Sequence, residues 1–151
     1  MAAEKRVLLA RPHAFIVNQM RPFLLDAGYE AMGARDFDHL RTALASSFRG
    51  AIISTAVTST VEADAATVFR LVRERQPRLP VVFAGMADAA TMRITAERAV
   101  KDLVANPVLV GPDDYRPGAD RQATFLILRK DDLVDAAAVE RAARALRSHF
   151  G

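Results

Sequence analysis

Apolar residues along the chain follow two patterns that alternate. Short continuous runs indicate buried strands, whereas apolar residues spaced three or four positions apart indicate the buried face of a helix. The predicted strands lie at residues 6–10, 29–34, 51–53, 81–85 and 124–129. A helical pattern follows each of them, beginning near residues 16, 37, 61, 89 and 136. This alternation predicts a parallel sheet with helices on both faces.

Local signals mark where several helices begin and end. Asp36, Asp88 and Asp135 each precede a helical pattern, where a carboxylate can accept a hydrogen bond from the first turn. Gly28 follows the first helical pattern and provides its end. Pro22 lies inside that pattern, so we expect either a kink or the first turn of a shorter helix.

One segment breaks the alternation of the single domain predicted over residues 1–151. Residues 106–122, called the insert below, are rich in Pro, Gly and Asp, and they exceed the usual connection of about 2 to 6 residues. Val108 to Val110 inside the insert are a candidate extra edge strand. The insert, with Tyr115, is either a recognition surface or a loop that only covers an edge strand.

Composition narrows the classes of protein to consider. The chain has no cysteine, which excludes disulfides, thiolate zinc sites and cysteine nucleophiles. No apolar run reaches the roughly 20 residues of a membrane span, and the N-terminal apolar stretch is too short for a signal peptide. We therefore expect a cytoplasmic protein. Basic residues are scattered among acids despite a net charge of +3, so the sequence does not favour nucleic-acid binding.

Three stretches give the chain a resemblance to a known family. VLLARP ends the first strand, GAIISTAV covers the central strand, and LPVVFAG with FLILRK covers the last two. In this order they resemble the receiver domain of bacterial two-component response regulators, over nearly the whole chain. The resemblance implies a doubly wound α/β fold of five parallel strands in the flavodoxin-like order 2-1-3-4-5, with the insert before the last strand.

The resemblance fails at the residues that carry the family's phosphotransfer chemistry. Thr55 stands at the position of the phosphoacceptor aspartate, Ala10 and Arg11 at those of two Mg²⁺-binding acids, and Gly85 at that of a switch hydroxyl. Lys130 alone matches the family. The resemblance therefore implies an atypical receiver, or pseudo-receiver, without metal or cofactor and without enzymatic activity.

The first functional hypothesis is a signalling adaptor that works without phosphorylation. It would bind a protein partner in a signalling pathway or form a homodimer. The family usually docks partners on its fourth helix, fifth strand and last helix. The corresponding candidate surface residues are Met92, Tyr115, Val139 and Leu146.

The alternative hypothesis is a small-molecule or anion-binding sensor at the carboxyl edge of the sheet. Arg11 and Lys130 would donate hydrogen bonds there, with the Thr55 hydroxyl as a partner. A competing interpretation is that Arg11 pairs with Asp88 or Asp131 while Thr55 bonds to backbone. No metal site is expected, because the two histidines on helical patterns have no second ligand at metal spacing.

Overall fold

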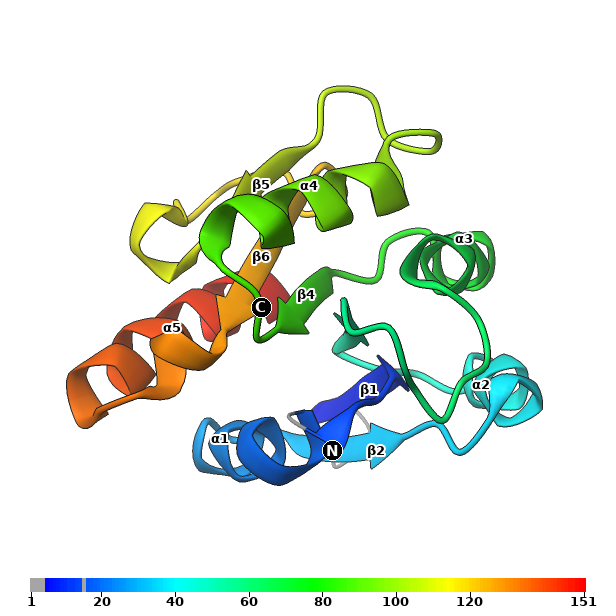
Figure 1. The fold of residues 1–151 in the computed structure, drawn as a ribbon, viewed down its shortest axis with the longest axis horizontal. Coiled ribbons are helices and arrows are strands. Elements are labelled where there is room, and N and C mark those ends of the chain that lie inside the picture. Colours follow the sequence, from blue (N-terminus) through cyan, green and yellow to red (C-terminus); the bar gives the residue numbers. More distant parts are fainter. Residues whose placement is uncertain (1–4, 15) are drawn as a thin grey trace.

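Six parallel strands form one sheet in the described part of the chain (Figure 1). The computed structural model describes residues 5–14 and 16–151. The strands are β1 (Arg6–Arg11), β2 (Glu30–Gly33), β3 (Gly50–Ser54), β4 (Val81–Gly85), β5 (Val108–Val110) and β6 (Thr124–Arg129). Their order is β2-β1-β3-β4-β6-β5. The parallel α/β architecture expected from the sequence is therefore confirmed.

The expectation of five strands in the order 2-1-3-4-5 is wrong by one strand. The insert contributes β5, which pairs with β6 and forms the edge of the sheet. The last predicted strand, now β6, is paired on both sides, with β4 and with β5. Most of β6 is buried, and a buried strand needs partners for its backbone groups. Val108 to Val110, the candidate extra edge strand of the sequence analysis, supply them, so that part of the prediction is confirmed.

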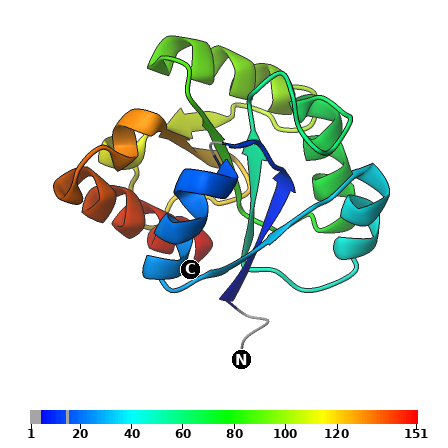
Figure 2. The same cartoon turned by 60° about the horizontal axis from the view of Figure 1, so that its bottom comes forward.

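Helices cover both faces of this sheet (Figures 1 and 2). One face carries α1 (Arg21–Asp26) and α5 (Ala136–Phe150), and the other carries α2 (Phe37–Ala43), α3 (Ala65–Arg75) and α4 (Ala89–Val100). The shorter helical turns are η2 (Ile16–Met20), η3 (Pro112–Asp114) and η4 (Lys130–Leu133). Pro22 lies in the first turn of α1, directly after the π-helical η2, which is the second of the two expected outcomes.

Aspartates cap four of these helices. Asp36, Asp88 and Asp135 accept hydrogen bonds of 2.7, 2.8 and 2.8 Å from backbone N–H groups of the first turns, as predicted. Asp64 caps α3 in the same way, accepting from the N–H of Thr67 at 2.8 Å. The third helix therefore begins at residue 65, later than the expected 61, and residues 55–64 form a long β3–α3 loop.

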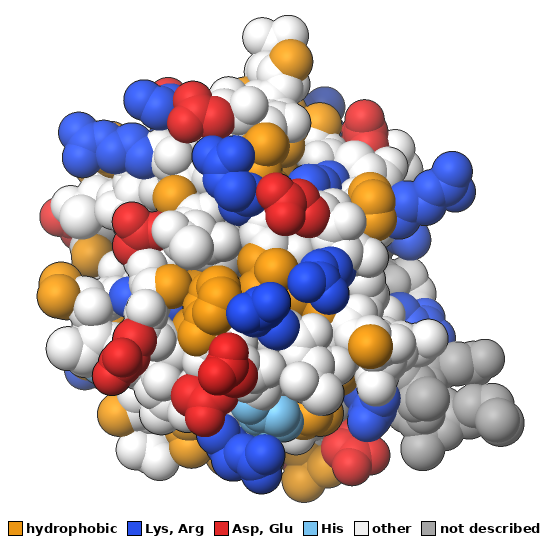
Figure 3. Space-filling model, turned by 90° about the vertical axis from the view of Figure 1, so that its right-hand side faces the viewer, with side chains coloured by type: hydrophobic (Ala, Val, Ile, Leu, Met, Phe, Trp, Pro, Cys, Tyr) orange, Lys and Arg blue, Asp and Glu red, His pale blue; other side chains and the backbone are white. Residues whose placement is uncertain are grey.

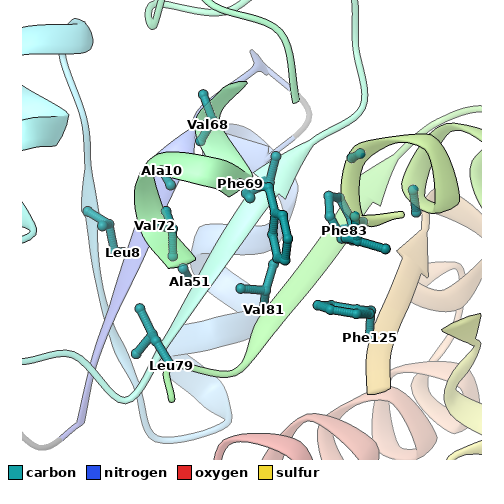
Figure 4. Packing of buried hydrophobic residues seen from close by; sticks show 14 of the residues in the cluster. Leu8, Ala10, Ala51, Val68, Phe69, Val72, Leu79, Val81, Phe83 and Phe125 are labelled. Carbon is teal, nitrogen blue, oxygen red and sulfur yellow. The ribbon is translucent and has the colours of Figure 1, made fainter. Parts of the chain in front are cut away.

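The core on the α2–α3–α4 side contains three packed phenylalanines. Phe69 of α3, Phe83 of β4 and Phe125 of β6 are fully buried, with ring centroids 5.5–6.2 Å apart (Figure 4). Aromatic pairs at this separation add roughly 0.5–1.5 kcal/mol beyond the burial of their area. They fasten α3 to the middle of the sheet, and so they fix the far end of the β3–α3 loop.

The surface over α2 and α3 carries both signs of charge. Basic and acidic side chains are interspersed on this face around a few hydrophobic ones (Figure 3). This face therefore lacks the continuous basic stripe that nucleic-acid binding favours. In the described part of the chain, every helix is too short or too polar to cross a membrane.

Candidate functional site

The carboxyl ends of β1, β3, β4 and β6 meet at one edge of the sheet. The register pairs Arg11 with Ile53 and Gly85 with Arg129, so neighbouring strands end nearly level. Ligands of open parallel sheets bind outside this edge. The predicted pocket residues lie at or next to these strand ends: Ala10, Arg11, Thr55, Gly85 and Lys130.

Arg11 is a buried cation that is bonded to backbone carbonyls. Its side chain is 4% exposed. Nε donates a hydrogen bond to the carbonyl of Ala63 at 2.7 Å, and Nη2 donates one to the carbonyl of Val57 at 3.1 Å. Nη1 donates to two carbonyls, that of Ser54 at 3.0 Å and that of Ala56. Four of the five guanidinium N–H donors are thus used. The end of β1 is thereby tied to both ends of the β3–α3 loop.

Burial, rather than a paired acid, dominates the electrostatics of Arg11. Desolvation lowers the pKa of Arg11, and Asp64 opposes that shift through its charge. The pKa of Asp64 is lowered first by its hydrogen bonds from Thr67, with the charge of Arg11 a lesser cause. The expected pairing of Arg11 with Asp88 or Asp131 is wrong, because carbonyls take its donors instead.

Thr55 occupies space that a side chain at residue 85 would need. Its Oγ1 lies 3.2 Å from Sδ of Met92 and 3.5 Å from the carbonyl of Ala84. A Cβ on Gly85 would overlap Thr55 Oγ1 and lie 3.0 Å from Met92 Sδ. The Thr55 hydroxyl is therefore packed against the start of α4, and a larger residue at position 85 would have to displace it.

The three residues proposed to bind an anion do not point their donors at a common site. Arg11 directs its guanidinium into the β3–α3 loop. Lys130 is the exposed first residue of η4, and Ala10 beside Arg11 is fully buried and has no polar side chain. An anion at Lys130 would compete with water rather than meet a preorganised pair of cations.

The residues at this edge do not suit the Mg²⁺ that the receiver chemistry uses. Magnesium takes oxygen ligands in near-octahedral geometry, usually including carboxylates. A methyl group and a permanent cation, Ala10 and Arg11, stand at the positions predicted from the sequence for those acids. The nearby carbonyls of Ser54, Ala56 and Val57 already accept hydrogen bonds from Arg11. Within residues 5–14 and 16–151, no cluster of three or more acids or histidines could hold a metal.

The predicted partner-surface residues are mostly unavailable to a partner. Met92 and Leu146 are fully buried, so they belong to the core. Val139 is half-buried against the α1–α5 side of the core. Tyr115 is half-buried and its hydroxyl is bonded within the protein. Met92, Val139 and Leu146 were chosen by their helical spacing, and that spacing identifies the helix faces that pack on the sheet.

His149 is a buried polar residue that the sequence interpretation did not single out. Its Nε2 lies 3.0 Å from the carbonyl of Val81, which can only accept, so Nε2 carries the proton. Nδ1 is then the acceptor for the Tyr115 hydroxyl at 2.9 Å. Burial lowers the pKa of His149 to about 4. Its position next to Leu146 and Phe150 on the predicted helix was the signal that placed it in the core.

A cavity lies beside Arg11 at the same edge. Its volume is about 500 Å³, and its described lining comes from the β1–η2 turn and from the β3–α3 loop. Pro12 and Val17 supply apolar surface, while Asn18, Ser59 and Thr60 supply hydrogen-bonding groups. Apart from His13, the described lining residues carry no ionisable side chain.

No protein-family model and no curated protein matches the chain. Solved structures do match. The NtrX receiver domain from Brucella abortus superposes with a TM-score of 0.55 at 17% identity, over 95% of this chain and 96% of that domain. A response regulator receiver protein from Sinorhizobium medicae superposes with a TM-score of 0.56 at 17% identity, over 97% of both chains. The chain has the receiver fold.

Two further matches agree with this assignment of the fold. Chemotaxis protein CheY4 from Vibrio cholerae gives a TM-score of 0.56 at 16% identity, over 95% of this chain and 97% of that protein. The chain spans only 28% of the longer NtrX protein from Brucella abortus, and it is about the length of the isolated NtrX receiver domain. At sequence identities this low, the likeness shows only the receiver fold. The chemistry of the site must be inferred from the residues described above.

Proposed function

We propose that this chain is a receiver-like signalling adaptor that binds a protein partner without control by phosphorylation. The observation that carries the proposal is Arg11. A buried guanidinium stands where the receiver chemistry needs a metal-binding acid, and it is bonded to carbonyls of the β3–α3 loop. The loop is therefore held by a cation that belongs to the protein and that no phosphoryl donor removes.

Two other positions support a loss of phosphotransfer. Thr55, at the proposed nucleophile position, is a neutral hydroxyl packed against Met92. Gly85 has no hydroxyl to bind a phosphoryl oxygen, and Thr55 fills the space where one would stand. Lys130, the residue that matches the receiver pattern, remains exposed and has no anionic intermediate to stabilise.

The partner surface differs from the one that the receiver pattern suggests. The insert places β5 along β6, and η3 packs on α5, so the chain's own residues line the region between α4 and α5. Asp113 of η3 also pairs with Arg141 of α5 at 3.1 Å. NtrC4, another neighbour, has a receiver domain that forms a dimer in its beryllofluoride-activated state. A dimer of this chain through the region between α4 and α5 would have to use the outer surface of the insert.

Thermal melting with and without Mg²⁺ and beryllofluoride tests the proposal. Beryllofluoride mimics a phosphoryl group on an aspartate, and a ligand that binds only the folded state raises Tm. The NtrC4 receiver domain is the positive control, since it accepts beryllofluoride. We expect the control to shift and this chain to keep its Tm. A Mg²⁺-dependent rise in Tm for this chain would show that another carboxylate has taken over the phosphoacceptor role.

The cavity beside Arg11 favours a second candidate function, a small-molecule sensor. Its volume of about 500 Å³ falls in the range of ligand pockets, about 300–1,000 Å³. The lining suits a small uncharged molecule that combines an apolar face with hydrogen-bonding groups. Thr60→Trp would fill the cavity from the β3–α3 loop. A compound that raises the Tm of the wild type but not of Thr60→Trp supports this candidate, and a screen without such a compound removes it.

A further inference from the structure

Three large hydrophobic side chains are exposed at the carboxyl edge of the sheet. Val57 is 95% exposed, Val134 73% and Met86 55%. Each lies in the loop that follows a strand, namely β3, β6 and β4 respectively. These strands are consecutive neighbours in the sheet, so the three loops begin at adjacent points of its carboxyl edge. Exposed apolar groups gathered in this way mark an interaction surface more often than scattered ones do.

The loop that presents Val57 is held in place. The carbonyl of Val57 accepts a hydrogen bond from Arg11 Nη2 at 3.1 Å, and the carbonyl of Ala56 accepts one from Arg11 Nη1. At the other end of the loop, Ala63 accepts from Nε at 2.7 Å. The exposure of Val57 therefore belongs to a fixed backbone, and a partner would lose little loop entropy on binding it.

The three loops themselves carry mainly negative charge, although Arg129 at the end of β6 pairs with Asp131 at 3.2 Å. The three loops, residues 55–64, 86–88 and 130–135, contain one basic residue, Lys130, and six acids. The acids are Glu62, Asp64, Asp88, Asp131, Asp132 and Asp135. Hydrogen bonds from the first turns of α3 and α4 lower the pKa of Asp64 and of Asp88, so both stay ionised in neutral solution.

We infer that this carboxyl-edge surface docks a basic amphipathic segment of a protein partner. Apolar side chains of the segment would cover Val57, Met86 and Val134, and its Lys or Arg side chains would face the surrounding carboxylates. The inference rests on the proposed adaptor function and specifies its partner surface. An acidic segment is excluded by repulsion, and a second copy of this chain would leave the carboxylates without cations unless it presented a basic face.

An NMR titration of the isotope-labelled chain tests the surface directly. The probe is a synthetic amphipathic peptide of about 18 residues built from Leu and Lys, with a Leu and Glu peptide of the same pattern as its counterpart. Both titrations are run without Mg²⁺ or a phosphoryl donor. We expect the Leu and Lys peptide to shift resonances of residues 55–64, 86–88 and 130–135, and to bind more weakly as salt is added.

Matched variants separate this surface from general stickiness. The double variant Val57→Ser and Val134→Ser should weaken binding by about tenfold or more, since each serine removes apolar area from the contact. Leu25→Ser, at a 70% exposed position on α1, should leave the affinity unchanged. Both variants change exposed residues, so both should fold as the wild type does.

Several outcomes would overturn the inference. The acidic peptide could bind as tightly as the basic one, or the resonance shifts could lie on other surfaces. The double variant and Leu25→Ser could also weaken the binding of the basic peptide equally. A concentration-dependent dimer that the double variant abolishes would identify a second copy as the occupant instead. None of these results depends on phosphorylation, so the beryllofluoride melt tests the adaptor function separately. If the Tm does not shift and the peptide does not bind, the docking surface is rejected while the adaptor function stands.

Discussion

The hydroxyl of Tyr115 lies 2.9 Å from Nδ1 of His149, and this bond joins the insert to the last helix. The two rings also meet edge-on, with centroids 5.3 Å apart. His149 in turn donates from Nε2 to Val81 at the start of β4. The insert, α5 and the sheet are therefore linked by one chain of hydrogen bonds through the buried ring of His149, and a single tautomer of His149 satisfies both neighbours.

This arrangement predicts that stability falls in mild acid. The pKa of His149 lies at about 4 in the folded protein, below its ordinary value of 6.5, because burial disfavours the charged ring. The unfolded chain thus binds the proton first. The stabilising contribution is complete above pH 6.5 and is lost as the pH falls toward 4, by about 3 kcal/mol in all.

Urea denaturation between pH 7.5 and 4.5 measures this loss. His149→Gln is the control, because its amide can still donate to Val81 but does not titrate. We expect the free energy of unfolding of the wild type to decline more steeply than that of the variant below pH 6.5. Parallel curves for the two proteins would assign the decline to other groups.

Arg11→Met should destabilise the protein by about 2–5 kcal/mol. The change leaves four backbone carbonyls of the β3–α3 loop without their buried donors. The stability of Arg11→Lys should lie between that of the wild type and that of Arg11→Met, because an ammonium group has three donors and lacks the planar fork of a guanidinium. The measurement is urea denaturation, together with the rate at which a Glu-specific protease cuts at Glu62 in the loop. Arg35→Met, at an exposed position, should stay within about 0.5 kcal/mol of the wild type.

Gly85→Ala should cost about 1–3 kcal/mol by overlapping the Thr55 hydroxyl. In a Thr55→Ala background the same change should cost less, because Oγ1 is gone and only Met92 Sδ, 3.0 Å from the new Cβ, must adjust. Denaturation of both single variants and of the double variant completes a double-mutant cycle. Additive effects would mean that Thr55 does not fill the space beside Gly85.

Gly50→Ala should destabilise the protein by a similar amount, about 1–3 kcal/mol, because its Cβ would overlap the ring of Phe150. Gly50 opens the central strand and lies under the end of α5. Gly111→Ala is the matched control, since no heavy atom lies within 4 Å of its new Cβ. Thermal melts of the two variants compare them directly. An unchanged Tm for Gly50→Ala would show that α5 can move away from β3 without cost.

The sequence by itself determined most of the elements and three of the four aspartate caps. Continuous apolar runs such as 81–85 and 124–129 are buried strands, because a strand covered on both faces has no polar side to show. Asp36, Asp88 and Asp135 begin helices because their carboxylates satisfy N–H groups of the first turn. Leu103 continues the helical spacing of Met92, Ala96 and Ala99 in the sequence, but it is 41% exposed because α4 ends at Val100.

Only the tertiary structure decided what the polar residues do. Whether Val108–Val110 form a strand depends on the free edge of β6, which lies 14 or more residues away in sequence. The donors of Arg11 and the tautomer of His149 are likewise set by carbonyls from distant segments. A residue's type states which hydrogen bonds it can make, but the partner is chosen by the packing that brings two segments together.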